Sequence, residues 1–175
     1  MKKDIPRVTE IIKDSNVLPD WSMVSSETME AKSILGTSVH RLCSDFSKGK
    51  VKLTDSPASD YARQFVKWLR EAQAKVIQSE FTIRAEVSGL KYIGHADLEF
   101  LWNGGPWLAD IKTGVFHRSQ ELQLAGYAAG GYRLHRRAIL KLTPTSAKLI
   151  PLKKTKEADW AWEACCTLYR WRHGK

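Results

Sequence analysis

The feature that most constrains the fold is a change of hydrophobic period near residue 76. Before it, apolar residues recur at helical spacing in three segments, around residues 8–12, 26–49 and 57–72. After it, residues 76–87, 92–102 and 107–113 have the pattern of three successive strands, with turns at Gly89 and residues 103–106. Short turns between neighbouring strands predict a three-stranded meander on one side of a β-sheet.

The remaining chain alternates between the two periods. We expect a helix over 119–132, strands over 138–143 and 148–152, and a last helix over 156–171. This order predicts an α/β (α+β) fold, with a central mixed sheet of about five strands flanked by helices. The chain has 175 residues and 43% hydrophobic content. That length and content suit one core, so we expect residues 1–175 to form a single domain.

Composition narrows the setting in which such a chain works. No stretch reaches the apolar length of a membrane span, and the first six residues lack the apolar run of a secretion signal. We therefore expect an intracellular protein without a membrane partner. Cys43, Cys165 and Cys166 are odd in number and lack metal-binding spacing, so we expect small core residues rather than disulfides or zinc ligands.

The charge balance points to a particular kind of partner. The chain has 28 Lys and Arg against 19 Asp and Glu, a net charge of +9. Such an excess favours a polyanion such as DNA. A solvated basic surface is the alternative, and charge alone does not separate the two.

Two acidic motifs lie on neighbouring predicted strands. The first is GHAD at 94–97, which ends in Asp97, and the second is DIKTG at 110–114. Because side chains alternate along a strand, Asp110 and Lys112 share one face and Ile111 lies on the other. Two carboxylates and a lysine near a strand end can hold a divalent cation against a phosphodiester. The alternative is a surface salt bridge.

Four further residues could complete such a site. His40 lies on the second predicted helix, and Glu80 opens the first strand, near Asp97 on its neighbour. Gln123 and Tyr127 are four residues apart, hence on one face of the helix that follows the Asp110 strand. For His40 the simpler alternative is a satisfied helix histidine, and for the helix pair it is packing on the sheet.

Together these motifs resemble a known family of nucleases. In order they are Gly36-x-x-x-His40, Gly94-x-x-Asp97, Asp110-x-Lys112-Thr113-Gly114 and Gln123-x-x-x-Tyr127. They resemble the successive motifs of the PD-(D/E)XK superfamily, in particular its RecB-like and phage exonuclease branch. The chain has Ala96 where the superfamily name places proline, and Asp110 where glutamate is an alternative. Both are within the pattern of the RecB-like branch.

The resemblance implies a restriction-endonuclease-like core and a role for each motif residue. It implies catalytic roles for Asp97, Asp110 and Lys112. It implies that a metal is held by His40, Asp97, Asp110 and the main-chain carbonyl of Ile111. Glu80 is a further candidate because of its predicted position near Asp97, not because of the resemblance. It implies that Gln123 and Tyr127 hold DNA or brace the site. We expect Lys112 to orient water or stabilise charge, since a general base would need a strongly lowered pKa.

The function implied is that of a DNA exonuclease dependent on Mg²⁺ or Mn²⁺, of phage type, in recombination or end processing. No iron–sulfur cluster is expected, because the three cysteines do not match the set that such members use. The alternatives are a structure-specific or nicking endonuclease of the same fold, and a non-cleaving DNA-binding module. DNA is the expected partner, while a homo-oligomeric ring and a recombination single-strand annealing protein stay open. The location would be the host cytoplasm if a phage encodes the chain.

Several histidines and aromatic residues have no motif position. We expect His95, His117 and His135 to be structural or to lie near phosphates. The tryptophans of the last helix, Trp160, Trp162 and Trp171, are expected to pack in the core, as are Trp68, Trp102 and Trp107. Base stacking on single-stranded DNA is the alternative for these rings.

Overall fold

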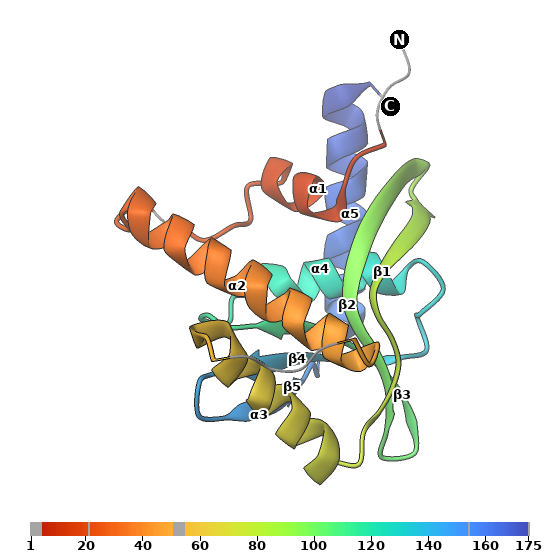
Figure 1. Cartoon of the computed structure of the whole chain (residues 1–175). Helices are drawn as coiled ribbons and strands as arrows, with labels where there is room; N and C mark the ends of the chain where they lie inside the picture. Colours follow the sequence, from red (N-terminus) through yellow and green to blue (C-terminus); the bar gives the residue numbers. More distant parts are fainter. Residues whose placement is uncertain (1–4, 21, 51–54, 154, 175) are drawn as a thin grey trace.

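A five-stranded mixed sheet with the strand order β1-β2-β3-β4-β5 lies at the centre of the chain (Figure 1). The computed structural model describes residues 5–20, 22–50, 55–153 and 155–174. The elements are α1 (Val8–Asp14), α2 (Ser26–Ser47), α3 (Pro57–Glu71), β1 (Lys75–Val87), β2 (Leu90–Trp102), β3 (Gly105–Lys112), α4 (Ser119–Ala128), β4 (Arg136–Leu142), β5 (Ala147–Pro151) and α5 (Thr155–His173). The predicted fold class, a mixed sheet flanked by helices, is confirmed.

The strand pairings explain why the acidic motifs meet. Strands β1, β2 and β3 form the predicted antiparallel meander, while β3 and β4 pair in parallel, with α4 as the crossover. The pairing of β2 with β3 starts at Leu98 opposite Ala109. Asp97 and Asp110 are the next residues outward, so both carboxylates lie where the two strands stop pairing.

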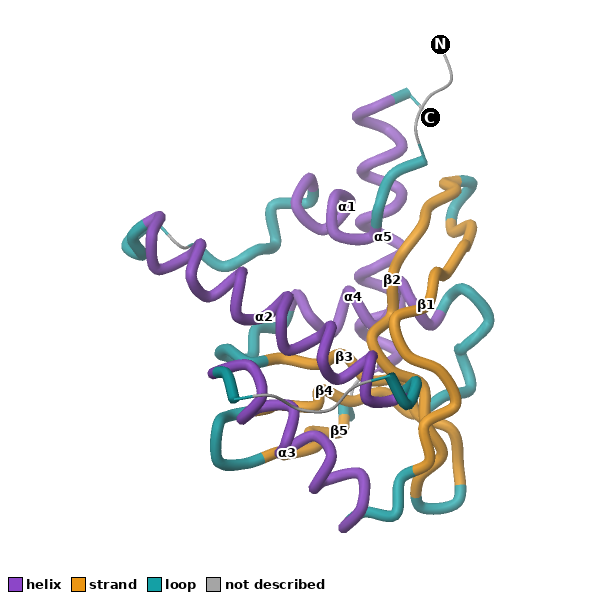
Figure 2. The backbone as a smooth tube through the Cα atoms, in the orientation of Figure 1, coloured by secondary structure: helices purple, strands orange, loops and turns teal. Residues whose placement is uncertain are grey.

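Helices cover both faces of the sheet and create two hydrophobic cores. One core joins α2 and α3 to the sheet and contains Phe65, Leu98 and Phe100. The other joins α1, α4 and α5 to the opposite face, around Tyr92 and Trp162. Figure 1 shows α2 crossing in front of α4, and Figure 2 shows the long β1–β2 hairpin beside the C-terminal half of α2. The three cysteines are buried in these cores, as predicted.

Local signals placed most helix ends correctly. The Ser25 and Ser56 side chains accept hydrogen bonds from the main chain of the first turns of α2 and α3. Helix α2 continues through Gly36 without a break, and a Cβ added there would make an ordinary contact with Thr113 Oγ1 at 3.8 Å. The predicted helix over 119–132 was too long. It ends at Ala128, and the turn after it includes Gly131 at a φ of 111°, which favours glycine.

The prediction that all three α5 tryptophans pack in the core was wrong for two of them. Trp162 is 1% exposed, whereas Trp160 is 67% and Trp171 is 80% exposed. Helix α5 packs on the rest of the molecule through one face only, and that face contains Ala158, Trp162, Cys165 and Cys166. Trp107 is buried, and Trp68 and Trp102 are partly buried. Among the described residues, no helix is both long and apolar enough to cross a membrane.

Candidate functional site

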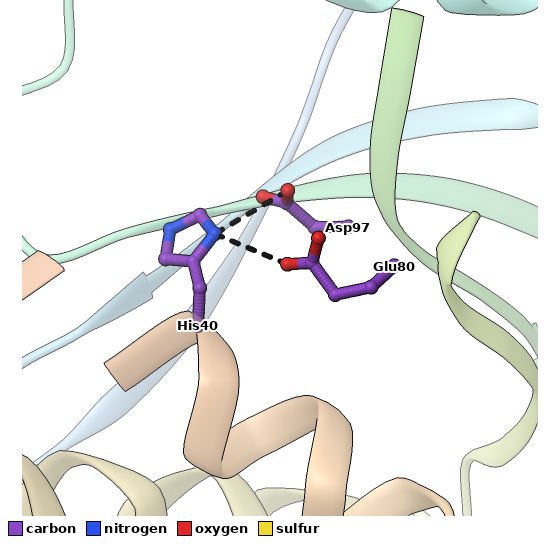
Figure 3. A group of neighbouring side chains, drawn as sticks. All are labelled: His40, Glu80 and Asp97. Atoms are coloured by element: carbon purple, nitrogen blue, oxygen red, sulfur yellow. Dashed lines mark ion pairs between the residues drawn. The ribbon is translucent and has the colours of Figure 1, made fainter. Parts of the chain in front are cut away.

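Three side chains from three elements converge beside α2. His40 comes from α2, Glu80 from β1 and Asp97 from β2, and one ligand atom of each lies within 4.8 Å of the others. Figure 3 shows the imidazole turned toward both carboxylates. Its Nδ1 is 3.3 Å from Asp97 Oδ1 and 3.7 Å from Glu80 Oε1. One nitrogen and two carboxylates at these separations can bind a divalent metal ion.

Glu80 has a backbone conformation that is unusual for a strand residue. Glu80 has a φ of +47°, although Ser79 and Phe81 on either side keep their pairing to β2. In a regular strand, residues 79 and 80 would point to opposite faces. Here both reach α2, since Ser79 Oγ lies 3.2 Å from Ser44 Oγ and Glu80 contacts His40. A non-glycine residue held in this conformation inside a strand is a form of strain that concentrates at functional sites.

The main chain of β3 holds the Asp97 carboxylate in place through a hydrogen bond. The Ile111 N–H donates to Asp97 Oδ2 at 2.7 Å, just beyond the point where β2 and β3 stop pairing. In an extended strand, the N–H and C=O of one residue point toward the same neighbouring strand. The carbonyl of Ile111 therefore faces the Asp97 side, the direction required by its predicted role as a metal ligand.

Asp110 and Lys112 form a separate pair next to this group. Lys112 Nζ lies 2.7 Å from Asp110 Oδ2, and Asp110 is 0% exposed. Both residues lie on one face of β3, as the strand period predicted. Neither carboxylate oxygen of Asp110 has a well-aligned hydrogen-bond donor among the described residues. Asp110 lies outside the three-residue group but close enough to interact electrostatically with His40 and Asp97.

Burial and charge set the protonation of this pair. Burial raises the pKa of Asp110 to about 7, although the Lys112 ammonium opposes the rise. For Lys112, burial lowers the pKa, but the Asp110 and Asp97 carboxylates outweigh it and leave the pKa raised. Lys112 therefore keeps its proton near neutral pH, as expected for a charge-stabilising group rather than a general base.

Two neighbouring carboxylates favour the protonated form of His40. Burial lowers its pKa, but the hydrogen bonds to Asp97 and Glu80 outweigh burial and raise the pKa to about 10. The pKa of Asp97 is lowered because the hydrogen bond from His40 and nearby positive charges overcome its burial. The Nδ1 atom of His40 thus faces both carboxylates, so a bound cation would have to displace a proton there.

Gln123 and Tyr127 lie on α4, behind the strands that carry the acidic residues. Gln123 Nε2 donates to the Tyr127 hydroxyl at 2.6 Å, and Tyr127 is buried. A Cβ added at Gly94 would lie only 2.6 Å from the Tyr127 ring. The glycine of the Gly94-x-x-Asp97 motif therefore lets this ring rest directly on β2, which positions α4 against the acidic strands.

An open pocket of about 470 Å³ lies in front of the three-residue group. It is lined by Gly36, Thr37, His40, Arg41, Ser44, Asp45, Glu80, His95 and Asp97. Asp110, Lys112, Gln123 and Tyr127 are not among its lining residues. The motifs missed Arg41, Ser44 and His95. His95 could have been found from the period of β2, because it lies two residues before Asp97.

The other two unassigned histidines have structural contacts. His117 Nδ1 accepts the N–H of Ser119 at the start of α4, at 3.2 Å. His135 Nε2 lies 2.8 Å from Glu99 Oε1, in a partly buried network. The sequence prediction of structural or phosphate-proximal roles is thus met by contacts inside the protein for these two.

Comparison with known proteins supports the fold. No protein-family model matches the chain, and no curated protein sequence matches it. A crystal structure from Eubacterium rectale, described as a "putative exonuclease", is 11% identical, with a TM-score of 0.50 over 80% of this chain and 68% of that one. A crystal structure of SSO0001 is 14% identical, with a TM-score of 0.49 over 96% of this chain and 78% of that one. The chain thus has a fold similar to that of the E. rectale protein.

Proposed function

We propose that the chain is a metal-dependent deoxyribonuclease of the PD-(D/E)XK type that degrades DNA from its ends. One observation carries the proposal. His40, Glu80 and Asp97 converge at an open pocket, and the Asp110–Lys112 pair lies on the adjoining strand. The four motifs noted in the sequence supply these residues, apart from Glu80, in the order expected of that superfamily.

The donor set fits a hard divalent cation such as Mg²⁺ or Mn²⁺. Its oxygens would come from carboxylates of Glu80, Asp97 and Asp110. The buried Asp110 Oδ1 has no hydrogen-bond partner among the described residues, so a cation would satisfy it. His40 would contribute a nitrogen after losing its proton, and the Ile111 carbonyl a further oxygen. When bound, the metal would polarise the phosphodiester and help to ionise an attacking water.

The chain's own groups would prepare the site for this reaction. The Ile111 N–H holds the Asp97 carboxylate in place, so little reorganisation is needed at that ligand. The Lys112 ammonium keeps its proton and lies beside Asp110, where it would stabilise negative charge that develops on the phosphate. Tyr127 and Gln123 would brace the acidic strands from behind.

DNA is the proposed substrate, and attack from an end the proposed mode. The net charge of +9 favours a polyanionic substrate. By analogy of fold alone, the similarity to a protein described as a "putative exonuclease" favours end-dependent action over internal cleavage. Recombination or end processing in a phage-type system is the corresponding biological role.

The decisive experiment is time-resolved digestion of end-labelled linear duplex DNA with Mg²⁺, with Mn²⁺ and with a chelator. We expect progressive release of nucleotides only with metal, and no cleavage of closed circular DNA. Asp110→Asn should lower the rate by about 10²–10³-fold. The matched control is Asp60→Asn on α3, which removes an exposed carboxylate paired with Arg63 and should leave the rate unchanged.

Other outcomes would redirect the proposal. Nicking or linearisation of circular DNA would show an endonuclease of the same fold. Salt-dependent DNA binding without metal-dependent cleavage would show a non-cleaving binding module. Activity that persists in Asp110→Asn would contradict the site itself.

A further inference from the structure

A polar row continues along α2 beyond His40, toward the end of the helix. Lys48 Nζ donates to Ser44 Oγ at 2.8 Å, and Ser44 Oγ lies 3.2 Å from Ser79 Oγ. Arg41 precedes Ser44 and lines the same pocket. We call this group the α2 phosphate subsite: Arg41, Ser44, Lys48 and Ser79.

Both hydroxyl-bearing residues of the subsite are buried, and a cation contacts one of them. Ser44 and Ser79 are each 6% exposed, and the exposed Lys48 folds its ammonium onto Ser44. An ammonium has three N–H donors, of which this contact uses one. Within the described part of the chain, no ion pair joins Lys48 to a carboxylate. Lys48 therefore keeps donors and an uncompensated charge for an anion.

Arg41, the second cation of the subsite, has only a weak ion-pair partner. The Arg41 side chain is 84% exposed, and its Nε lies 3.7 Å from Asp45 Oδ2, one helical turn away. Such an exposed pair is worth little in water. The guanidinium can therefore swing to a phosphate, for which its fork of donors is well suited.

The subsite is formed by α2 and β1, and in each of these elements it lies next to a residue of the proposed metal group. Ser44 follows His40 by four residues, about 6 Å along the helix axis. Ser79 directly precedes Glu80 in β1. Since phosphates of one DNA strand are spaced by about 3.4 Å along the duplex axis, this separation corresponds to one or two nucleotides.

From these observations we infer that the α2 phosphate subsite binds a backbone phosphate one or two nucleotides away from the bond that is cut. The inference rests on the proposed nuclease function and specifies its substrate. The protein would act on a strand that continues past the cleaved bond. It would bind that strand independently of base sequence, because phosphate contacts carry no base information.

The first test is a scan with neutral linkages. Short oligonucleotides each carry one uncharged methylphosphonate, placed at successive positions beside the cleaved bond. For the unmodified protein, one position should lower kcat/KM by about tenfold, through KM rather than kcat. In Lys48→Ala the unmodified oligonucleotide should show that same loss, and the neutral linkage at that position should add nothing further.

Salt dependence of binding gives a readout that does not need cleavage. Lys48→Ala should make the slope of log K against log salt shallower by about 0.7–0.9, the value for one lost phosphate contact. The matched control is Lys67→Ala on α3, an exposed lysine already paired with Glu71, which should leave both readouts unchanged. Ser44→Ala should reproduce part of the Lys48 effect.

The outcomes separate this inference from the proposed function. If no oligonucleotide is cut, the nuclease proposal fails, and the salt slope still tests the subsite. If cleavage occurs but Lys48→Ala and the neutral linkages act additively at every position, with an unchanged salt slope, the subsite is refuted and the nuclease proposal stands.

Discussion

Strand β2 carries two acidic residues that are two positions apart, and each contacts a histidine. Asp97 lies 3.3 Å from His40, and Glu99 lies 2.8 Å from His135. Both carboxylates are more than nine-tenths buried. From residue type and burial alone, the two places look alike.

Their surroundings, rather than their own hydrogen bonds, show how different they are. Both oxygens of Glu99 have donors, since His135 Nε2 contacts Oε1 and Gln78 Nε2 donates to Oε2 at 2.6 Å. Gln78 also donates to the Tyr132 hydroxyl at 2.9 Å. None of these residues lines the pocket in front of Asp97. The Glu99 network therefore ties the segment after α4 to β1 and β2 and gives each oxygen of its carboxylate a partner inside the protein, away from the pocket.

Around Asp97 the balance is reversed. Three carboxylates, those of Glu80, Asp97 and Asp110, share two cationic side chains, and among the described residues Asp110 Oδ1 has no hydrogen-bond partner. The group also opens to a pocket, and its Glu80 backbone is strained. An excess of acceptors in an open, strained place is what marks a binding site, whereas a buried acid with a histidine partner does not by itself.

The strongest test of the difference between the two sites is to remove the charge of each acid in turn. Asp97→Asn should lower nuclease activity by about 10³-fold, because it removes a metal ligand and the anion that faces His40. Glu99→Gln should leave activity within about twofold and instead lower the free energy of unfolding by about 1–3 kcal/mol, through the disturbed buried network. End-labelled digestion and chemical denaturation measure the two effects.

Equal losses of activity in the two variants would contradict the distinction. A loss confined to Glu99→Gln would place the chemistry in the other network. Circular dichroism at the assay temperature is the control that both variants remain folded.

The next largest effect should come from Lys112→Met, which keeps side-chain length but removes the charge. We expect kcat to fall by about 10²–10³-fold, since the ammonium would stabilise charge that develops in the transition state. Binding of Mn²⁺ should persist, because Lys112 is not a ligand. Lys148→Met, at the far edge of the sheet on β5, is the matched control and should change neither quantity. A Lys112 variant with normal kcat would exclude the lysine from the chemistry.

The sequence predicted the local parts of this site better than its assembly. The strand period placed Asp110 and Lys112 on one face, and the turn signals at Gly89 and residues 103–106 gave the meander that brings Asp97 beside Asp110. These features depend on residues close together in the chain. The core positions of the cysteines followed from composition alone.

Features that depend on distant packing could not be predicted. The contact of Ser44 with Ser79 requires α2 to lie along β1 and Glu80 to adopt a positive φ, and no local pattern signals either. The exposure of Trp160 and Trp171 depends on how much of α5 is covered by the rest of the protein. The hydrophobicity of these side chains alone predicted a place in the core. The placement of Tyr127 on Gly94 is likewise visible only in the assembled sheet and helix.

A third effect, of intermediate size, concerns pH. Because the pKa of His40 is raised to about 10, metal binding must displace its proton throughout the neutral range. The affinity for Mn²⁺ should therefore rise with pH, by up to tenfold per unit between pH 7 and 8.5. Calorimetry in buffers of different ionisation enthalpy should show release of about one proton at pH 8. In His40→Gln the affinity should be lower and nearly independent of pH in this range, and a slope equal to that of the unmodified protein would exclude His40 as a ligand.

The smallest expected effect tests the strain at Glu80, which the Glu99 network lacks. Glu80→Gly should raise the free energy of unfolding of the metal-free protein by somewhat less than about 1 kcal/mol, because glycine adopts a φ of +47° without penalty. The lost contact with the partly exposed His40, at 3.7 Å, offsets only part of this gain. The same change should weaken Mn²⁺ binding, since it removes a carboxylate from the metal group.

Ser88→Gly, in the β1–β2 turn at a φ of 51°, is the matched control: it should give a similar gain in stability with no change in metal affinity. If both glycine variants bound Mn²⁺ equally well, Glu80 would not be a ligand, and its unusual backbone would serve only the contact between Ser79 and α2.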